Sequence, residues 1–162
     1  MGQAIEVPLT EEELEHVAAT LLGKMLFALS RLEISISYYV VWADHGRDLE
    51  ALTKKLEETM LNVKLRHLEK MFAIKYGVGT PPHSAMAAWL KQADVARELR
   101  NEFVHGRWGI ATHEQKVANV IGLPTSPRQR EVRYSIADLQ QILARVESLE
   151  PALGKLRKKW PL

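Results

Sequence analysis

The feature that most constrains the fold is an apolar residue at every third or fourth position, which recurs through most of the chain. Such a spacing places one apolar stripe along an α-helix. Thr10 and Glu13 form the pattern of a capping box, so we expect one long helix, or two stacked pieces, from Thr10 to about Gly46. Its buried stripe comprises Val17, Leu21, Met25, Leu29, Leu32, Ile36 and Tyr39.

Two more helices are predicted between residues 48 and 106. Asp48 opens the second, which continues to the stretch "YGVGTPP" (76–82). Its stripe comprises Leu49, Leu52, Leu56, Met60, Val63, Leu68, Met71 and Phe72. A third helix begins after Pro81 and Pro82 and ends at Gly106, a natural C′ residue. It is expected to bury Met86, Trp89, Leu90, Ala93, Ala96, Leu99 and Phe103.

The helical repeat is lost over residues 107–134, where short β-prone pieces surround "LPTSPRQ". We expect a β-hairpin or an irregular flap there. Ser135 as N-cap and Asp138 in the first turn then open a last helix, which Pro151 should kink or end. The predicted fold is therefore all-α: an up-and-down bundle of four main helices with a short β-hairpin or irregular insertion before the last one.

Length and composition favour a single domain over residues 1–162. A chain of 162 residues, of which 46% are hydrophobic, buries one core comfortably. Since it has no cysteine, disulfides and zinc–thiolate sites are excluded, and a reducing cytoplasm is expected. The start lacks the pattern of a secretory signal, and Lys24, Arg31 and Glu33 interrupt the most apolar region, so we expect no association with a membrane.

The formal net charge of +2 is unevenly distributed. Residues 1–81 carry 9 basic and 12 acidic side chains, whereas residues 82–162 carry 13 and 8. The densest basic runs are "SPRQREVR" (126–133) and "KLRKK" (155–159). Such runs either attract a polyanion or form an ordinary solvated surface.

The stretch "ELRNEFVHGRWG" (98–109) gathers the residues best suited to chemistry. At 100° per residue Arg100 falls in or beside the apolar stripe, where a guanidinium needs a carboxylate or a ligand phosphate. Asn101 and His105 share a face one turn apart. Arg100 and His105 diverge by about 140° and converge only where the helix ends. The negative end of the helix dipole favours an imidazolium at His105, which suits a general acid.

The motif "RNEFVH" (100–105), near the end of a penultimate long helix, resembles the signature of the HEPN superfamily, the higher-eukaryote and prokaryote nucleotide-binding domains. That signature is an arginine, four to six residues and a histidine, usually with a polar residue after the arginine. The resemblance implies a helical homodimer whose two motifs form a metal-independent endoribonuclease, in phage defence or toxin–antitoxin systems, with RNA and an antitoxin or nucleotidyltransferase protein as partners. Arg100 would hold the phosphate, His105 would move protons, and Asn101 would orient either.

Several alternatives stand beside this interpretation. Arg107 and His113 satisfy the same loose spacing, but Gly109 and the β-prone run between them argue against a helical site. In the structural alternative, His105 caps the last carbonyls of its helix. Trp108 and Arg107 are candidates for RNA contacts, with core packing and an exposed charge as the alternatives.

The predicted partner of Arg100, if that residue is buried, is Glu33. Glu33 either reaches solvent on the polar side of the first helix or faces inward and forms the ion pair. A non-catalytic HEPN-like module that binds a nucleotide or a protein is the alternative function. The six histidines lack the spacing of metal ligands, and no Gly-rich phosphate loop is present, so neither metal nor cofactor is expected. No short basic helix follows a tight turn, which argues against a helix-turn-helix DNA reader.

Overall fold

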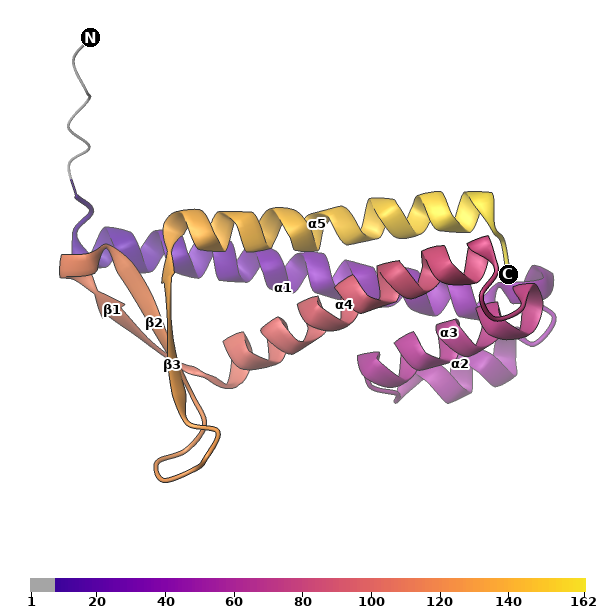
Figure 1. Cartoon of the computed structure of the whole chain (residues 1–162), viewed down its shortest axis with the longest axis horizontal. Coiled ribbons are helices and arrows are strands. Elements are labelled where there is room, and N and C mark those ends of the chain that lie inside the picture. Colours follow the sequence, from indigo (N-terminus) through magenta and orange to yellow (C-terminus); the bar gives the residue numbers. More distant parts are fainter. Residues whose placement is uncertain (1–7) are drawn as a thin grey trace, which may run out of the picture. The chain divides into compact units, whose positions relative to one another are not determined.

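The computed structural model describes residues 8–162, and over these residues the chain is mostly helical (Figure 1). Its elements follow the order α1 (Glu11–Val41), α2 (Leu49–Glu57), α3 (Leu61–Tyr76), α4 (Pro81–His105), β1 (Arg107–Ala111), β2 (Lys116–Ile121), β3 (Arg130–Ser135) and α5 (Ile136–Lys159). The prediction of a helical fold with a β insertion before the last helix is confirmed. The described residues form five α-helices, however, rather than four.

Helix α1 begins as the capping box predicts. The backbone N–H of Thr10 donates to Glu13 Oε2 at 2.9 Å, and Glu13 N–H donates to Thr10 Oγ1 at 3.3 Å. These hydrogen bonds hold the pKa of Glu13 below its usual value. Helix α5 begins in the same way, because Ser135 N–H donates to Asp138 Oδ2 at 2.8 Å and Asp138 N–H donates to Ser135 Oγ at 3.1 Å.

The predicted second helix is wrong, because the chain breaks it into α2 and α3. Thr59 N–H donates to the Leu56 carbonyl, its hydroxyl donates to the Lys55 carbonyl, and Met60 is extended with ψ 151°. A threonine hydroxyl that bonds its own backbone competes with the helical ladder. The break shifts the buried stripe: Met60 and Val63, which were expected to be buried, are 76% and 39% exposed, whereas Leu65, which lies outside the predicted stripe, is buried.

The prolines act differently at the two later helices. Pro81 and Pro82 occupy the first two positions of α4, where a missing N–H removes no helical hydrogen bond. Pro151 lies inside α5, which continues to Lys159, so of the two predicted outcomes, a kink or an end, the end is wrong. Both Pro151 and Glu147, the residue four positions earlier, are exposed, so water can satisfy the carbonyl that loses its donor.

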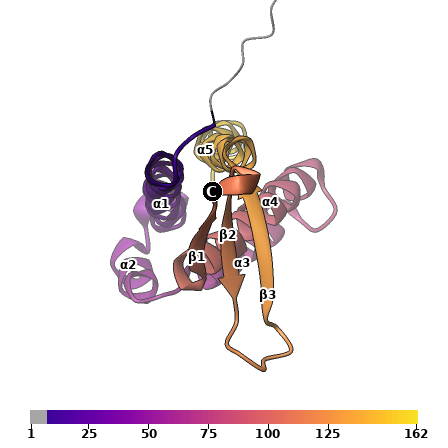
Figure 2. The same ribbon diagram turned by 90° about the vertical axis from the view of Figure 1, so that its left-hand side faces the viewer.

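Residues 107–135 form a three-stranded antiparallel sheet in the order β1-β2-β3 (Figure 2). Trp108 pairs with Asn119, which pairs with Val132, and Ile110 pairs with Val117, which pairs with Tyr134. These pairs share one face, and Val117, Asn119 and Tyr134 on it are buried. The β-prone pieces on both sides of "LPTSPRQ" are therefore strands, and the first piece contains two of them, β1 and β2, where one was expected.

The chain divides into two compact units, which we describe separately. One contains residues 26–100 and 145–162. In its core Trp89 Nε1 donates to the Leu149 carbonyl at 3.0 Å, tying α4 to α5, and Tyr39 packs edge-on against Phe72 at 6.0 Å. The other unit contains the described residues up to 25 and residues 101–144, including the sheet. Its core includes Leu14, Val117 and Leu139.

Gly106 joins α4 directly to β1 and has a structural requirement that differs from the predicted one. It does not have the positive φ of a C′ glycine. A Cβ at this position would lie 1.8 Å from Asn119 Oδ1 and 2.6 Å from the Glu102 carbonyl oxygen. Since real atoms do not approach so closely, the glycine is needed because the Asn119 side chain occupies the space of a side chain.

We therefore expect Gly106→Ala to destabilise the protein. Overpacking of a closed site costs roughly 1–3 kcal/mol, which should appear as a lower midpoint in thermal or urea unfolding. Gly109→Ala is the matched control, because a Cβ on Gly109 meets nothing within 4 Å. Equal stability of the two variants would contradict the assigned role of Gly106.

Candidate functional site

His105 is the last residue of α4, and its side chain is exposed. The helical ladder persists to this point, because Gly106 N–H donates to the Glu102 carbonyl at 2.8 Å. Within residues 8–162 the imidazole has no hydrogen bond or ion pair. It is therefore accessible to a ligand.

The structural role considered for His105 is performed by two other side chains. Asn119 Nδ2 donates to the Glu102 carbonyl at 3.0 Å, and Trp108 Nε1 donates to the Phe103 carbonyl at 2.9 Å. These are carbonyls of the last turn of α4, which an exposed helix end would leave to water or to a cap. The alternative in which His105 caps these carbonyls is therefore not what the structure shows.

Arg100 and Asn101 lie on the same continuous helix as His105. Ala96 and Phe103 are buried, but Arg100 is exposed, so of the two predicted positions it lies beside the packed stripe rather than in it. Asn101 is half-buried and lies one turn before His105, on the same face. Because α4 remains helical through His105, Arg100 and His105 leave the helix in directions about 140° apart.

Trp108 is a packing residue at the base of the sheet. Its ring lies 5.4 Å from that of Phe103 and 5.9 Å from that of Tyr134, and Phe103 meets Tyr134 edge-on at 5.5 Å. These distances are those of favourable aromatic pairs. The core-packing alternative for Trp108 thus describes its position, although the residue remains half-buried.

Arg107 differs from Trp108 because the two neighbours point to opposite faces of β1. It is exposed and makes no ion pair with any residue in the described part of the chain. His105 and Arg107 thus flank Gly106 as two accessible groups that can carry positive charge. Their proximity along the chain suits an anionic ligand.

The two basic runs have different environments. In the first, Arg130 forms an ion pair with Glu102, and Arg133 forms ion pairs with Glu114 and Glu131. In the second, no cation is paired with a carboxylate of residues 8–162. Two of its members instead lie over rings: the Arg157 guanidinium 5.7 Å from Tyr39, and Lys159 Nζ 4.5 Å from Trp160. The first run is therefore largely neutralised, and the second is not.

Glu33 faces the buried Lys64 from α1. Lys64 Nζ donates to Glu33 Oε1 at 2.8 Å, and the Lys64 side chain is only 7% exposed. Glu33 thus compensates a buried ammonium, because an unpaired charge in the interior costs several kcal/mol of folding free energy. The sequence analysis missed Lys64, because a lysine at a helical position ordinarily signals the solvent side. An ion pair of Glu33 with Arg100 stays a prediction.

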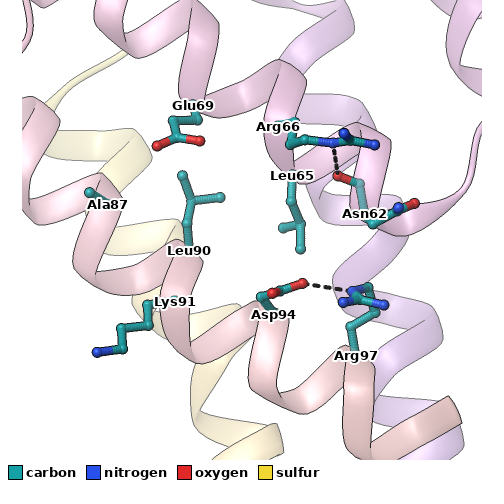
Figure 3. Close-up of a pocket in the computed structure, with 9 residues that line it drawn as sticks. All are labelled: Asn62, Leu65, Arg66, Glu69, Ala87, Leu90, Lys91, Asp94 and Arg97. Atoms are coloured by element: carbon teal, nitrogen blue, oxygen red, sulfur yellow. Dashed lines mark hydrogen bonds and ion pairs between the residues drawn. The ribbon is translucent and has the colours of Figure 1, made fainter.

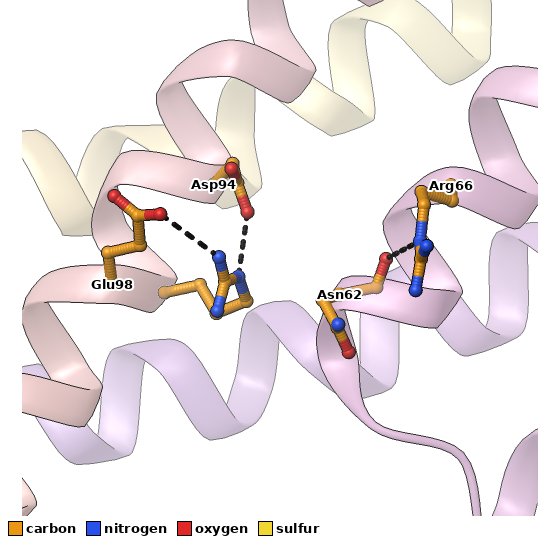
Figure 4. Close-up of polar contacts among 5 residues, drawn as sticks. Asn62, Arg66, Asp94 and Glu98 are labelled. Carbon is orange, nitrogen blue, oxygen red and sulfur yellow. Dashed lines mark hydrogen bonds and ion pairs between the residues drawn. The ribbon is translucent and has the colours of Figure 1, made fainter.

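A pocket of about 420 Å³ lies between α3 and α4 (Figure 3). Leu65 and Leu90 line it from the two helices. One of its cations is compensated by neighbouring carboxylates: Arg97 Nε donates to Asp94 Oδ1 at 2.7 Å, and Arg97 Nη2 lies 3.3 Å from Glu98 Oε1 (Figure 4). Arg66, Lys91 and Glu69 also line the pocket and form no ion pair with a described residue, so unpaired charges of both signs border it.

Comparisons with known proteins assign no family to this chain. No family model, curated protein or solved structure matches it. Over the described residues, no group of three or more His, Asp or Glu side chains is placed to hold a metal ion. Among the described helices, none has the length and apolarity needed to span a bilayer.

The capping geometry predicts that His105 and Asn119 contribute differently to stability. Asn119→Ala removes a buried donor and leaves a cavity, which should cost about 1–3 kcal/mol. His105→Ala removes an exposed side chain without a partner in residues 8–162, so its effect should stay within about 0.5 kcal/mol. Urea unfolding of both variants and the parent under one set of conditions measures the two losses. A loss for His105→Ala as large as that for Asn119→Ala would assign His105 a structural role.

Proposed function

We propose that this protein is a HEPN-like, metal-independent endoribonuclease that acts as a homodimer in the cytoplasm, in phage defence or a toxin–antitoxin system. The observation that carries the proposal is the state of His105: an exposed imidazole at the end of α4, released from capping by Asn119 and Trp108. Arg107 lies two residues away, and Arg100 and Asn101 lie on the same helix. An antitoxin or nucleotidyltransferase protein would be the partner that such a system implies.

The chemistry that suits these residues is attack by the RNA 2′-hydroxyl on the adjacent phosphate. The nucleophile is already held beside its target, so no protein nucleophile is needed. His105 accepts the 2′-hydroxyl proton or donates one to the departing 5′-oxygen, and Asn101 orients the imidazole or the phosphate. Arg100 offsets the charge that grows on the phosphate oxygens. The products are a 2′,3′-cyclic phosphate and a 5′-hydroxyl.

The geometry of α4 supports a site built from two chains. Side chains that leave one continuous helix about 140° apart do not converge on a single phosphate. In a two-fold dimer, Arg100 of one chain and His105 of its partner can approach the same phosphate from opposite sides. Each chain then contributes to two equivalent halves of the site.

A non-catalytic nucleotide- or protein-binding module is the second candidate. It is favoured by the packing of Trp108 against Phe103 and Tyr134 and by the ion pairs that neutralise Arg130 and Arg133. These contacts leave fewer unpaired cations and exposed rings in this unit to bind the phosphates and bases of a long RNA. The two candidates differ in whether His105 performs chemistry, so a cleavage assay separates them.

We expect the purified protein to cleave RNA in the presence of EDTA and to leave the corresponding DNA intact. His105→Ala should slow cleavage by roughly 100- to 10,000-fold, the usual contribution of a general acid or base. His113→Ala is the matched control, because His113 is also exposed but lies outside α4. The readout is gel analysis of a labelled RNA, with end-group analysis of the products.

Three results would count against this mechanism: unchanged cleavage by His105→Ala, loss of cleavage on adding EDTA, or a 3′-hydroxyl end. RNA binding without cleavage would instead support the non-catalytic module. Circular dichroism of each variant shows whether the fold is intact, so that a loss of activity reports on chemistry.

Light scattering at micromolar concentration should give the mass of a dimer, with α4 or its C-terminal end at the interface. Val104, which is 47% exposed beside His105, is suited to that interface, so Val104→Glu should shift the mass toward the monomer. Val95→Glu is the control: Val95 is 53% exposed but lies half a helical turn around α4 from Val104. A parent protein that is monomeric would contradict the two-chain site.

A further inference from the structure

A groove lies between the first turns of α1 and the strand β1, within one unit. Its volume is about 400 Å³. One wall is helical, with Glu11, Glu15 and Ala19, and the other is formed by Trp108, Gly109 and Ile110 of β1. This volume lies within the range of ligand pockets, about 300–1,000 Å³.

The strand that borders the groove is an edge strand. β1 pairs only with β2, so one row of its backbone N–H and C=O groups has no strand partner among the described elements. Such an edge is a template for another strand unless charges, proline or a bulge protect it. The opposite edge, β3, carries Arg130, Glu131 and Arg133. β1 has a single charged residue, at its start, and so lacks that protection.

The middle of β1 carries no side chain that would obstruct an incoming backbone. Gly109 is exposed, and a Cβ placed on it would meet no atom within 4 Å. Trp108 and Ile110, on either side of it, are half-buried and supply an apolar surface to the groove. Ala19 on the helical wall is small, which keeps the space between helix and strand free. The groove therefore combines unpaired backbone with apolar side-chain surface.

The helical rim gives the groove a negative charge. Glu11 and Glu15 are exposed and lie one turn apart on the same face of α1. Neither forms an ion pair with a residue in the 8–162 range. The helix dipole accounts for a carboxylate in the first turn, but its effect falls off beyond that turn and does not account for Glu15. Two unpaired carboxylates beside an apolar groove favour a cationic partner.

We propose that this groove binds an extended segment of a partner protein in which basic and apolar residues alternate, added to β1 as a fourth strand. Main-chain hydrogen bonds to the β1 edge would supply affinity. Because side chains alternate between the faces of a strand, the basic ones would face the groove, with their methylene stems on Trp108 and Ile110 and their charged ends at Glu11 and Glu15, while the apolar ones project to the other face. The proposal does not depend on RNA cleavage, since it uses neither Arg100 nor His105.

The probe is a capped hexapeptide of alternating lysine and valine, labelled for fluorescence anisotropy, beside a matched peptide of glutamate and valine. The lysine peptide should bind the full chain, and the glutamate peptide should not. The double variant Glu11→Gln/Glu15→Gln should weaken binding about three- to tenfold, the worth of two exposed ion pairs. Glu12→Gln is the charge-matched control, because Glu12 does not line the groove.

A second pair of variants tests the location. Ala19→Trp should fill the groove and abolish binding, whereas Thr20→Trp, at the exposed neighbouring position, should leave it unchanged. Hydrogen exchange of the complex should show added protection over residues 107–111. His105→Ala should bind the peptide as the parent does, so failure of RNA cleavage and failure of this proposal are distinguishable.

The proposal is overturned if neither peptide binds, if both bind equally, or if Ala19→Trp binds like the parent. It is also overturned if Ala19→Trp, but not Thr20→Trp, changes the mass measured by light scattering, because a second copy of the chain would then be the occupant.

Discussion

The hydrogen bond from Asn119 to the Glu102 carbonyl is the contact on which the end of α4 depends. It comes from the central strand of the sheet and reaches the last turn of the helix across a gap that only a glycine at position 106 leaves open. Since Asn119 is fully buried, its donor must be satisfied in place, and the helix carbonyl is what it finds. The sheet therefore determines where the helix stops and where the next strand begins.

The same contact sets the chemical freedom of the residues around it. A helix end without a cap would recruit its own terminal side chains or water to its carbonyls. Here Asn119 and Trp108, both in strands of the sheet, donate to these carbonyls, so His105 does not cap them. Arg107, next along the chain, is directed to solvent because its neighbour Trp108 is directed to the core. The buried amide of Asn119 and the indole of Trp108 thus leave His105 and Arg107 accessible on either side of Gly106.

The helical part of the fold was predictable because apolar spacing and capping residues are local signals. The Thr10–Glu13 box and the Ser135–Asp138 box both form, and the stripe from Met86 to Phe103 is buried apart from the half-buried Leu99. The break at Thr59 was not predictable, since neither glycine nor proline marks it and the apolar repeat continues through Met60. The burial of Lys64 depends on Glu33, a residue 31 positions away, and such long-range pairs leave no local signal.

The candidate site was predictable only in part. The motif from Arg100 to His105 was identified from its residue types, and the structure places all of it on α4. Its surroundings were not, because they depend on which strand lies beside the helix end. Asn119, which caps the end of α4 beside Gly106, lies in a β-prone stretch, where an asparagine suggests a turn rather than a buried cap. The neutralisation of Arg133 likewise depends on Glu114, which follows β1 in the chain.

That neutralisation changes how the molecule attracts other molecules at a distance. An arginine in contact with a carboxylate presents a dipole, whose field decays much faster than that of a single charge, and at physiological ionic strength free charges are themselves screened over about 8 Å. The cations of Lys155 to Lys159 have no such carboxylate within the described chain, so they dominate the long-range attraction of a polyanion. Salt should therefore slow the encounter with a polyanion chiefly by screening the end of α5, even though residues 126–133 carry three arginines of their own.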